Sequence, residues 1–290
     1  MNFIHGNNLE QKETHKTKYR DAVSREYLSE IRIKYDQWKK ENHDLKGPVS
    51  VASSEDTKLI EKRVSLLNEY KDFIDQQHYA EKFDSRSNLH SSVLEEFLYY
   101  LFKDLVQDIS KDALIGKCHA FKDIFFRPSN FSTMVNKIEA NIEKKDHDFA
   151  IGVSVLSSLK CRGNESPEID EWDIPAVAIE CKTYLDKTML QDASTAADQI
   201  KQKNPNAMYI VCAEWLKLTD SVNLKKYKID QIYVLRKQKN TDREFRYLDD
   251  YVKNPVYSDG VEHLFNTVRD YLITDWEGGV SDGLNKGFLL

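Results

Sequence analysis

The chain has 290 residues, of which 40% are hydrophobic and 31% charged, and its formal net charge is −6. This length and composition are typical of a globular protein with a sizeable core, and they exclude the disordered and fibrous classes. No apolar stretch approaches the roughly 20 residues of a membrane span. The first residues also lack the apolar region of a secretory signal, so we expect a cytoplasmic location.

The four cysteines, Cys118, Cys161, Cys181 and Cys212, are far apart and form no CxxC pair. This spacing argues against a structural zinc site and against a disulfide scaffold. Charge is spread unevenly, because the segment 221–239 has six basic residues and one acid. A local excess of this kind fits either a polyanion-binding surface or an ordinary solvated face.

The first third of the chain has the apolar period of amphipathic helices. We expect helices over 16–42, 55–77 and 91–109. The third has a wide apolar stripe that suits a helix packed on a sheet. It opens with Ser92 and Glu95 in the spacing of a capping box, which gives Glu95 a structural duty.

After residue 111 the apolar period changes to short runs rich in Val, Ile, Phe and Tyr, which indicate strands. Five strands are expected, over 118–126, 148–156, 175–182, 207–215 and 229–236. Further helices are expected over 185–205 and 260–276, and an exposed loop over 160–173. The element order predicts an α/β domain with an N-terminal helical extension.

We divide the chain into three regions on this basis. Residues 1–90 form an N-terminal helical region that contacts DNA or another subunit, 91–240 form the core, and 241–290 form a C-terminal helix and tail.

The strand over 175–182 ends in charges where its pattern indicates a buried strand. Glu180 and Lys182 lie two residues apart, so they point to the same face, and Cys181 points to the other. Charges placed beside a core are normally paired or bound to a metal. A simple strand-end ion pair between Glu180 and Lys182 is the alternative reading of this pair.

A second acidic cluster begins the strand over 148–156, where Asp146 and Asp148 mark the change from polar to apolar sequence. If the two strands are neighbours, one of these aspartates converges with Glu180. Two carboxylates and a backbone carbonyl are oxygen ligands suited to Mg²⁺. Lys182 beside them would complement a phosphate charge, so the set fits metal-assisted phosphodiester hydrolysis.

These residues resemble the PD-(D/E)xK nuclease pattern, in which an aspartate is followed on a later strand by Glu-x-Lys. The proline of the pattern is absent, since His147 precedes Asp148. The resemblance implies an αβββαβ core, a mixed sheet flanked by helices, which is the element order expected above.

Longer stretches resemble the subunits of BbvCI-type restriction endonucleases, from about Lys62 through Lys239. The stretches that carry this resemblance are "FDSRSNLHSSVLEEFLYYLF", "KDHDFAIG", "IPAVAIECK", "AEWLKL" and "IDQIYVLRKQ". The resemblance implies a bacterial enzyme whose two related subunits each cut one DNA strand. Relatives with a single kind of subunit act as homodimers on palindromic sites.

The resemblance also implies roles for individual residues. Asp148 and Glu180 would be Mg²⁺ ligands, together with the carbonyl of Cys181, and Mn²⁺ could substitute. Lys182 would face the phosphate or position water. Asp146 competes with Asp148, which is preferred because it directly enters the strand before an aromatic residue.

The helix over 91–109 offers one further acid to this site. Nucleases of this fold often contribute a glutamate from the corresponding helix. Because capping occupies Glu95, we select Glu96 as the supporting acid, with a solvent-facing helix glutamate as the alternative.

Candidate DNA contacts are Arg86, Arg236 and Lys237, since the fork of an arginine suits both phosphate and guanine. Glu214 and Gln199 are weaker candidates for the site, and no histidine shows ligand spacing.

The expected function is that of a type II restriction endonuclease subunit. It would hydrolyse double-stranded DNA at a specific short sequence as a homodimer, or as a heterodimer with a related nuclease subunit. Two alternatives remain open: a structure-specific repair or junction-resolving nuclease of the same fold, and a non-catalytic DNA-binding subunit.

Overall fold

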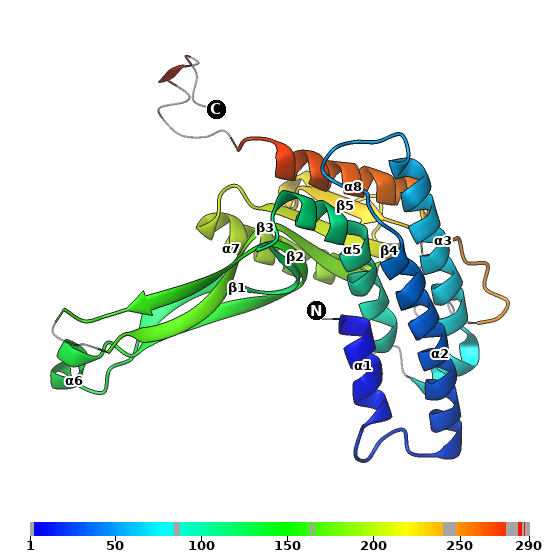
Figure 1. Cartoon of the computed structure of the whole chain (residues 1–290), viewed down its shortest axis with the longest axis horizontal. Coiled ribbons are helices and arrows are strands. Elements are labelled where there is room, and N and C mark those ends of the chain that lie inside the picture. Colours follow the sequence, from blue (N-terminus) through cyan, green and yellow to red (C-terminus); the bar gives the residue numbers. More distant parts are fainter. Residues whose placement is uncertain are drawn as a thin grey trace.

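A computed structural model describes residues 3–83, 88–162, 164, 166–239, 248–276, 284, 285 and 287. It has helices on both sides of one sheet, and a long arm extends from the sheet (Figure 1). The helices are α1 (Ile4–Glu13), α2 (Ala22–Asp44), α3 (Asp56–Ile74), α4 (Gln77–Lys82), α5 (Asn88–Ile109), α6 (Phe131–Asn136), α7 (Lys187–Lys203), the short η1 (Leu224–Lys226) and α8 (Ser258–Ile273). The strands are β1 (Leu114–Phe126), β2 (Ala140–Leu159), β3 (Glu168–Leu185), β4 (Met208–Leu216) and β5 (Gln231–Val234).

The sheet is mixed, with the strand order β1-β2-β3-β4-β5. The first three strands form an antiparallel meander, whereas β3, β4 and β5 are parallel. The parallel step from β3 to β4 passes through α7, as a crossover between parallel strands requires. The predicted fold class, a mixed sheet flanked by helices with an N-terminal helical extension, is confirmed.

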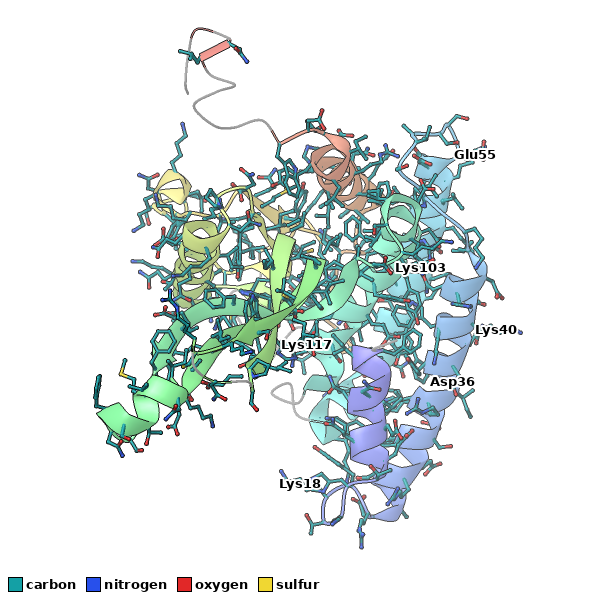
Figure 2. All side chains as sticks on the ribbon, turned by 60° about the vertical axis from the view of Figure 1, so that its left-hand side comes forward. Lys18, Asp36, Lys40, Glu55, Lys103 and Lys117 are labelled. Carbon is teal, nitrogen blue, oxygen red and sulfur yellow. The ribbon has the colours of Figure 1, made fainter. Side chains whose placement is uncertain are left out.

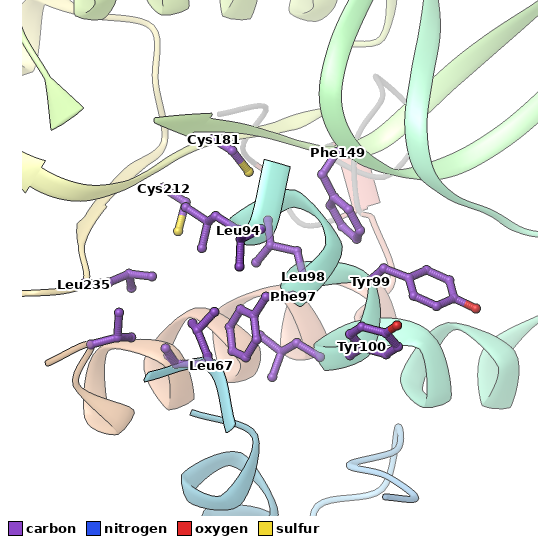
Figure 3. Close-up of a cluster of buried hydrophobic side chains, with 14 of the residues drawn as sticks. Leu67, Leu94, Phe97, Leu98, Tyr99, Tyr100, Phe149, Cys181, Cys212 and Leu235 are labelled. Atoms are coloured by element: carbon purple, nitrogen blue, oxygen red, sulfur yellow. The ribbon is translucent and has the colours of Figure 1, made fainter. Parts of the chain in front are cut away.

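The buried stripe of α5 forms the centre of the larger hydrophobic core. Figure 3 shows Leu94 and Leu98 of this helix on the side of Phe149 and Cys181 of the sheet, while Phe97 lies farther from the strands, beside Leu67. The same cluster includes side chains of α1, α2, α3 and α8. Residues from all three predicted regions therefore share one core, and α7 packs on the opposite face of the sheet over a smaller one.

The described elements differ from the sequence prediction mainly in length. The predicted exposed loop over 160–173 is wrong in its second half, because β3 already begins at Glu168. The capping box is also wrong: α5 is helical from Asn88, so Ser92 is an interior residue whose hydroxyl donates to the carbonyl of Leu89 at 3.4 Å. Helices α1, α4 and α6 were not predicted, since each is short and none has a full amphipathic repeat.

The arm consists of two antiparallel ribbons built around β2. Residues 140–147 of this strand pair with β1, and residues 153–159 pair with β3. Both ribbons extend away from the body and lie side by side, with α6 at the end (Figure 1). Near the body the ribbons are joined by Asp173, which accepts from the backbone N–H of His119 at 2.7 Å and from the hydroxyl of Ser154 at 2.7 Å.

Helix α1 is attached to α5 through a buried carboxylate. Oε2 of Glu96 accepts from the backbone N–H groups of His5 at 3.0 Å and Gly6 at 3.1 Å, which lie in the first turn of α1. Oε1 accepts from the hydroxyls of Tyr35 and Tyr100, both at 2.9 Å. A carboxylate at a helix N-terminus satisfies unpaired N–H groups and complements the helix dipole. Glu96 therefore acts as the N-terminal cap of α1, supplied from a distant part of the chain.

This cap predicts different effects for substitutions at two adjacent glutamates. We expect Glu96→Ala to lower the free energy of unfolding by about 3 kcal/mol or more, because buried donors lose their shared acceptor. Glu95→Ala serves as the matched control and should leave stability unchanged or raise it, since Glu95 accepts none of these bonds. Urea unfolding followed by circular dichroism measures both. Equal losses in the two variants would contradict the role of Glu96 as the cap.

Candidate active site

The end of the β2–β3 ladder brings two acids together. The last paired residues are Phe149 and Ile179, after which the strands separate. The carboxylate of Asp148 then accepts the backbone N–H of Cys181 at 2.9 Å, a bond that a strand carbonyl would otherwise accept. Asp148 is thus fixed beside Glu180, as predicted for neighbouring strands.

A bulge in β2, opposite Lys117 of β1, helps to direct Asp148. Gly116 pairs with Ala150 and Cys118 pairs with His147, so two residues of β2 oppose the single residue Lys117. Such a bulge leaves the extra residue unpaired and turns its side chain. The bulge frees the side chain of Asp148 to face β3, while Phe149 enters the core under α5.

Lys182 contacts both acids. Its Nζ lies 2.6 Å from Oε1 of Glu180 and 3.4 Å from Oδ2 of Asp148. The hydroxyl of Tyr209, on the neighbouring strand β4, donates to Oε2 of Glu180 at 3.3 Å. All three charged side chains are partly accessible, with exposed fractions between 21% and 31%. The group is therefore open to a ligand, which distinguishes it from a fully buried structural ion pair.

Burial and mutual repulsion change how these groups hold protons. Burial raises the pKa of Asp148, and the charge of Glu180 raises it further against the opposing effect of Lys182. For Lys182 burial acts in the opposite sense, yet Asp148 and Glu180 outweigh it and raise its pKa. The lysine consequently stays protonated, and the acid pair gains from an added positive charge.

A third acid, Glu95 of α5, faces the same group and corrects the sequence prediction. Burial, followed by the charge of Asp148, raises the pKa of Glu95 to about 8, while Lys182 and Lys117 act to lower it. Glu96, which was predicted here, instead caps α1. Consecutive helix residues point about 100° apart, and only the tertiary packing shows which one faces the strands.

Asp146 does not join the group, although it was the competing candidate. Its carboxylate bonds to Nδ1 of His119 at 2.7 Å, and this hydrogen bond lowers its pKa. His147, between the two aspartates, is buried, and burial lowers its pKa to about 4. A neutral imidazole beside Tyr209 packs under the site, with 5.8 Å between the ring centroids.

Cys181 has the orientation that the strand period predicts. Its side chain is buried in the core beneath α5, and burial raises the pKa of its thiol. Only its backbone reaches the site, through the N–H bonded to Asp148.

The structure does not support Arg236 as a DNA contact. Arg236 is fully buried, where Nε donates to Glu214 at 3.0 Å and Nη1 donates to the carbonyl of Asn254 at 2.6 Å. Its guanidinium also covers the ring of Trp215 at 4.7 Å, so a DNA-contacting role for Arg236 is wrong. Glu214, equally buried, belongs to this ion-pair network and not to the site.

Of the remaining weak candidates, Lys237 and Gln199 lie in the part of the chain that the structure describes. Lys237 is exposed and pairs with Asp259. Arg86 lies outside the described residues. Gln199 lies partly exposed on α7.

The carboxylates of Asp148 and Glu180 are potential ligands of a metal ion. Among the residues that the structure describes, no three His, Cys, Asp or Glu side chains form a ready-made metal cluster. Mg²⁺, however, keeps several waters and is commonly bound by one or two carboxylates. Asp148 and Glu180, with raised proton affinity at Asp148 and partial access to solvent, fit such an ion.

Two strand-end carboxylates that share a lysine, on a mixed five-stranded sheet with a helix packed behind it, define a protein of the restriction endonuclease type. The sequence supports this class. The chain belongs to the Bpu10I restriction endonuclease family, whose sequence pattern it matches over residues 86–289.

The fold is also similar to a solved structure described as the native BbvCI A2B2 tetramer at low resolution. The TM-score is 0.69 at 21% sequence identity, and the match covers 94% of this chain and 97% of that chain. No curated protein sequence gives a significant match. The resemblance to BbvCI-type restriction endonucleases is confirmed. No described helix is long and apolar enough to cross a membrane.

The raised pKa of Glu95 predicts how the stability of the fold changes with pH. A carboxyl whose pKa is 4.5 when unfolded and about 8 when folded binds more protons in the folded state between those values. The folded state therefore loses stability as pH rises through this window. Glu95→Gln removes the ionisation, so its melting temperature without metal should exceed that of the wild type by a margin that widens from about pH 5 to about pH 8.

Thermal unfolding in a pH series measures this margin, and Asp146→Asn is the control because the pKa of Asp146 is lowered. A margin that stays constant with pH would show that Glu95 does not ionise in this range.

Proposed function

We propose that this chain is a subunit of a type II restriction endonuclease that hydrolyses phosphodiester bonds of double-stranded DNA at a specific short sequence, with Mg²⁺ as cofactor and Mn²⁺ as a substitute. The observation that carries the proposal is the shared lysine: Lys182 lies within 3.4 Å of a carboxylate from each of two strands. A structural ion pair needs only one acid, whereas a metal and phosphate site needs both signs of charge side by side.

Asp148 and Glu180 would hold the ion, with the carbonyl of Cys181 as a third oxygen. When bound, Mg²⁺ supplies a positive charge that stabilises the charge developing on the phosphate. Lys182, kept protonated by its two acid neighbours, would orient the phosphate or the attacking water through its ammonium group. Glu95 would take up or release a proton near neutral pH as the local charge changes.

We also propose that the chain acts with a second subunit, either another copy or a related nuclease subunit, because one site of this kind cuts one strand. The BbvCI structure that shares the fold is described as an A2B2 tetramer. The N-terminal helical region, residues 1–90, is proposed to contact DNA or that subunit. The cytoplasm of a bacterium is the proposed location.

Alanine substitutions test the site. We expect Asp148→Ala, Glu180→Ala and Lys182→Ala each to lower the cleavage rate by at least about 100-fold, since each removes a charge that acts on the phosphate. DNA binding, measured by fluorescence anisotropy, should persist. Asp146→Ala is the matched control, because this acid lies two residues from Asp148 and bonds to His119 instead. Full cleavage by any of the three site variants would refute the assignment.

Plasmid DNA and Mg²⁺ test whether the second subunit is another copy of this chain or a related nuclease subunit. A chain that acts as a homodimer should linearise the plasmid at fixed positions, whereas a chain that needs a related subunit should nick it or leave it intact until that subunit is added. Cleavage at random positions would contradict sequence specificity and favour a repair nuclease.

A further inference from the structure

The end of the arm contains an unusual set of exposed side chains. We define the arm tip as the connection 127–139, which includes α6, together with the described residues of the connection 160–168. No residue of α6 is buried. Phe131 is 79% exposed, Val135 56% and Met134 44%. These three side chains are at positions i, i+3 and i+4 of α6 and so form one exposed apolar patch, which is typical of a surface that contacts a partner.

The backbone of the arm tip is nevertheless held firmly. The carboxylate of Glu168 accepts three backbone N–H groups, from Ile138 at 3.1 Å, Glu139 at 3.2 Å and Ala140 at 2.9 Å. Asn164 donates to the carbonyl of Asn136, the last residue of α6, at 2.6 Å. A rigid element that presents exposed side chains loses little entropy when it binds, which favours a contact function.

Charge indicates which partner the arm tip fits. Along the shaft of the arm two lysines are paired with acids, Lys122 with Glu143 at 2.9 Å and Lys144 with Asp170 at 2.7 Å. At the arm tip, no ion pair joins a described residue to any of four exposed cations. These are Arg127, Lys137, Lys160 and Arg162. Of the two described acids there, Glu168 is occupied by the backbone. Cations that no described acid neutralises, beside apolar side chains, are suited to a polyanion with a groove, which is duplex DNA.

The turn between α1 and α2 also carries exposed cations. It presents Lys16, Lys18 and Arg20, which are exposed and form no ion pair with a described residue. Figure 2 shows Lys18 at the far end of the N-terminal helices and Lys117 at the base of the arm, on the side toward those helices. Lys117 opposes Asp148 across the bulge, so the arm and the helical turn project on either side of the candidate site.

We infer that the arm tip grips duplex DNA beside the cleavage site, with its cations on phosphates and Phe131 in a groove, and that the α1–α2 turn holds the duplex on the other side. This inference rests on the proposed function. Ten residues of extended strand separate Lys117 from Arg127, a span of at most about 33 Å, or roughly ten base pairs. The arm tip thus reaches DNA nearly one helical turn from the site and belongs to the binding surface without touching the reacting atoms.

The test measures binding of the full-length chain to a 30-base-pair duplex of random sequence over a salt series, with Ca²⁺ in place of Mg²⁺. Lys137→Ala/Lys160→Ala should weaken binding by about tenfold and reduce the slope of log K against log salt by roughly two, one unit for each lost phosphate contact. Phe131→Ala should weaken binding with the slope unchanged, because an apolar contact releases no counterions.

Lys40→Ala/Lys58→Ala is the control. It removes the same charge from the side of the helices that faces away from the arm, where Figure 2 labels Lys40 and Glu55, the ion-pair partner of Lys58 at 3.1 Å. Its slope should remain close to that of the wild type.

Three results would overturn the inference. The arm-tip variant could keep the wild-type slope, the control could lose as much as the arm-tip variant, or the arm-tip variant could bind DNA normally while sedimentation velocity shows a lost oligomer. The last result would make the arm tip a subunit contact. A chain that binds DNA through the arm tip but never cuts it would contradict the proposed function and leave this inference standing.

Discussion

The hydrogen bond from the backbone N–H of Cys181 to the carboxylate of Asp148 is the interaction on which the candidate site depends. It lies where β2 and β3 separate, and it lets a side chain replace the strand carbonyl that would have continued the ladder. The apolar residues behind it, Phe149 and Ile179, fix both strands against α5. Asp148 and Glu180 therefore cannot move apart without breaking the sheet, even though their charges repel.

That repulsion is what gives the site its affinity for positive charge. The charge of Glu180 raises the pKa of Asp148, which shows that the two carboxylates repel each other. Lys182 offsets the repulsion between Asp148 and Glu180, and Lys117 adds to the positive charge near Glu95. Three acids still face two lysines, so one carboxyl tends to keep a proton. A bound cation would release that proton, which couples metal affinity to pH.

Helix α5 connects this chemistry to the rest of the chain. Its apolar stripe packs on the sheet, and its two consecutive glutamates point to different partners. Glu95 faces the acid group. Glu96 accepts hydrogen bonds from two backbone N–H groups in the first turn of α1 and from two tyrosine hydroxyls. The helix is thereby held on both sides, and the position of Glu95 depends on packing contributed by the N-terminal region.

The sequence alone determined the element types and the central pair of charges. Alternating and helical periods reflect which face of each element is buried, so the α/β class and most elements followed from them. Glu180 and Lys182 were recognisable because charges at the end of an apolar strand need a reason to be there. Only the tertiary structure decided the rest. It placed Asp148 and not Asp146 beside Glu180 through a bulge, directed Glu95 rather than Glu96 to the site, and buried Arg236 among acids. Each of these depends on the direction of a side chain relative to a distant segment, which a local sequence pattern does not contain.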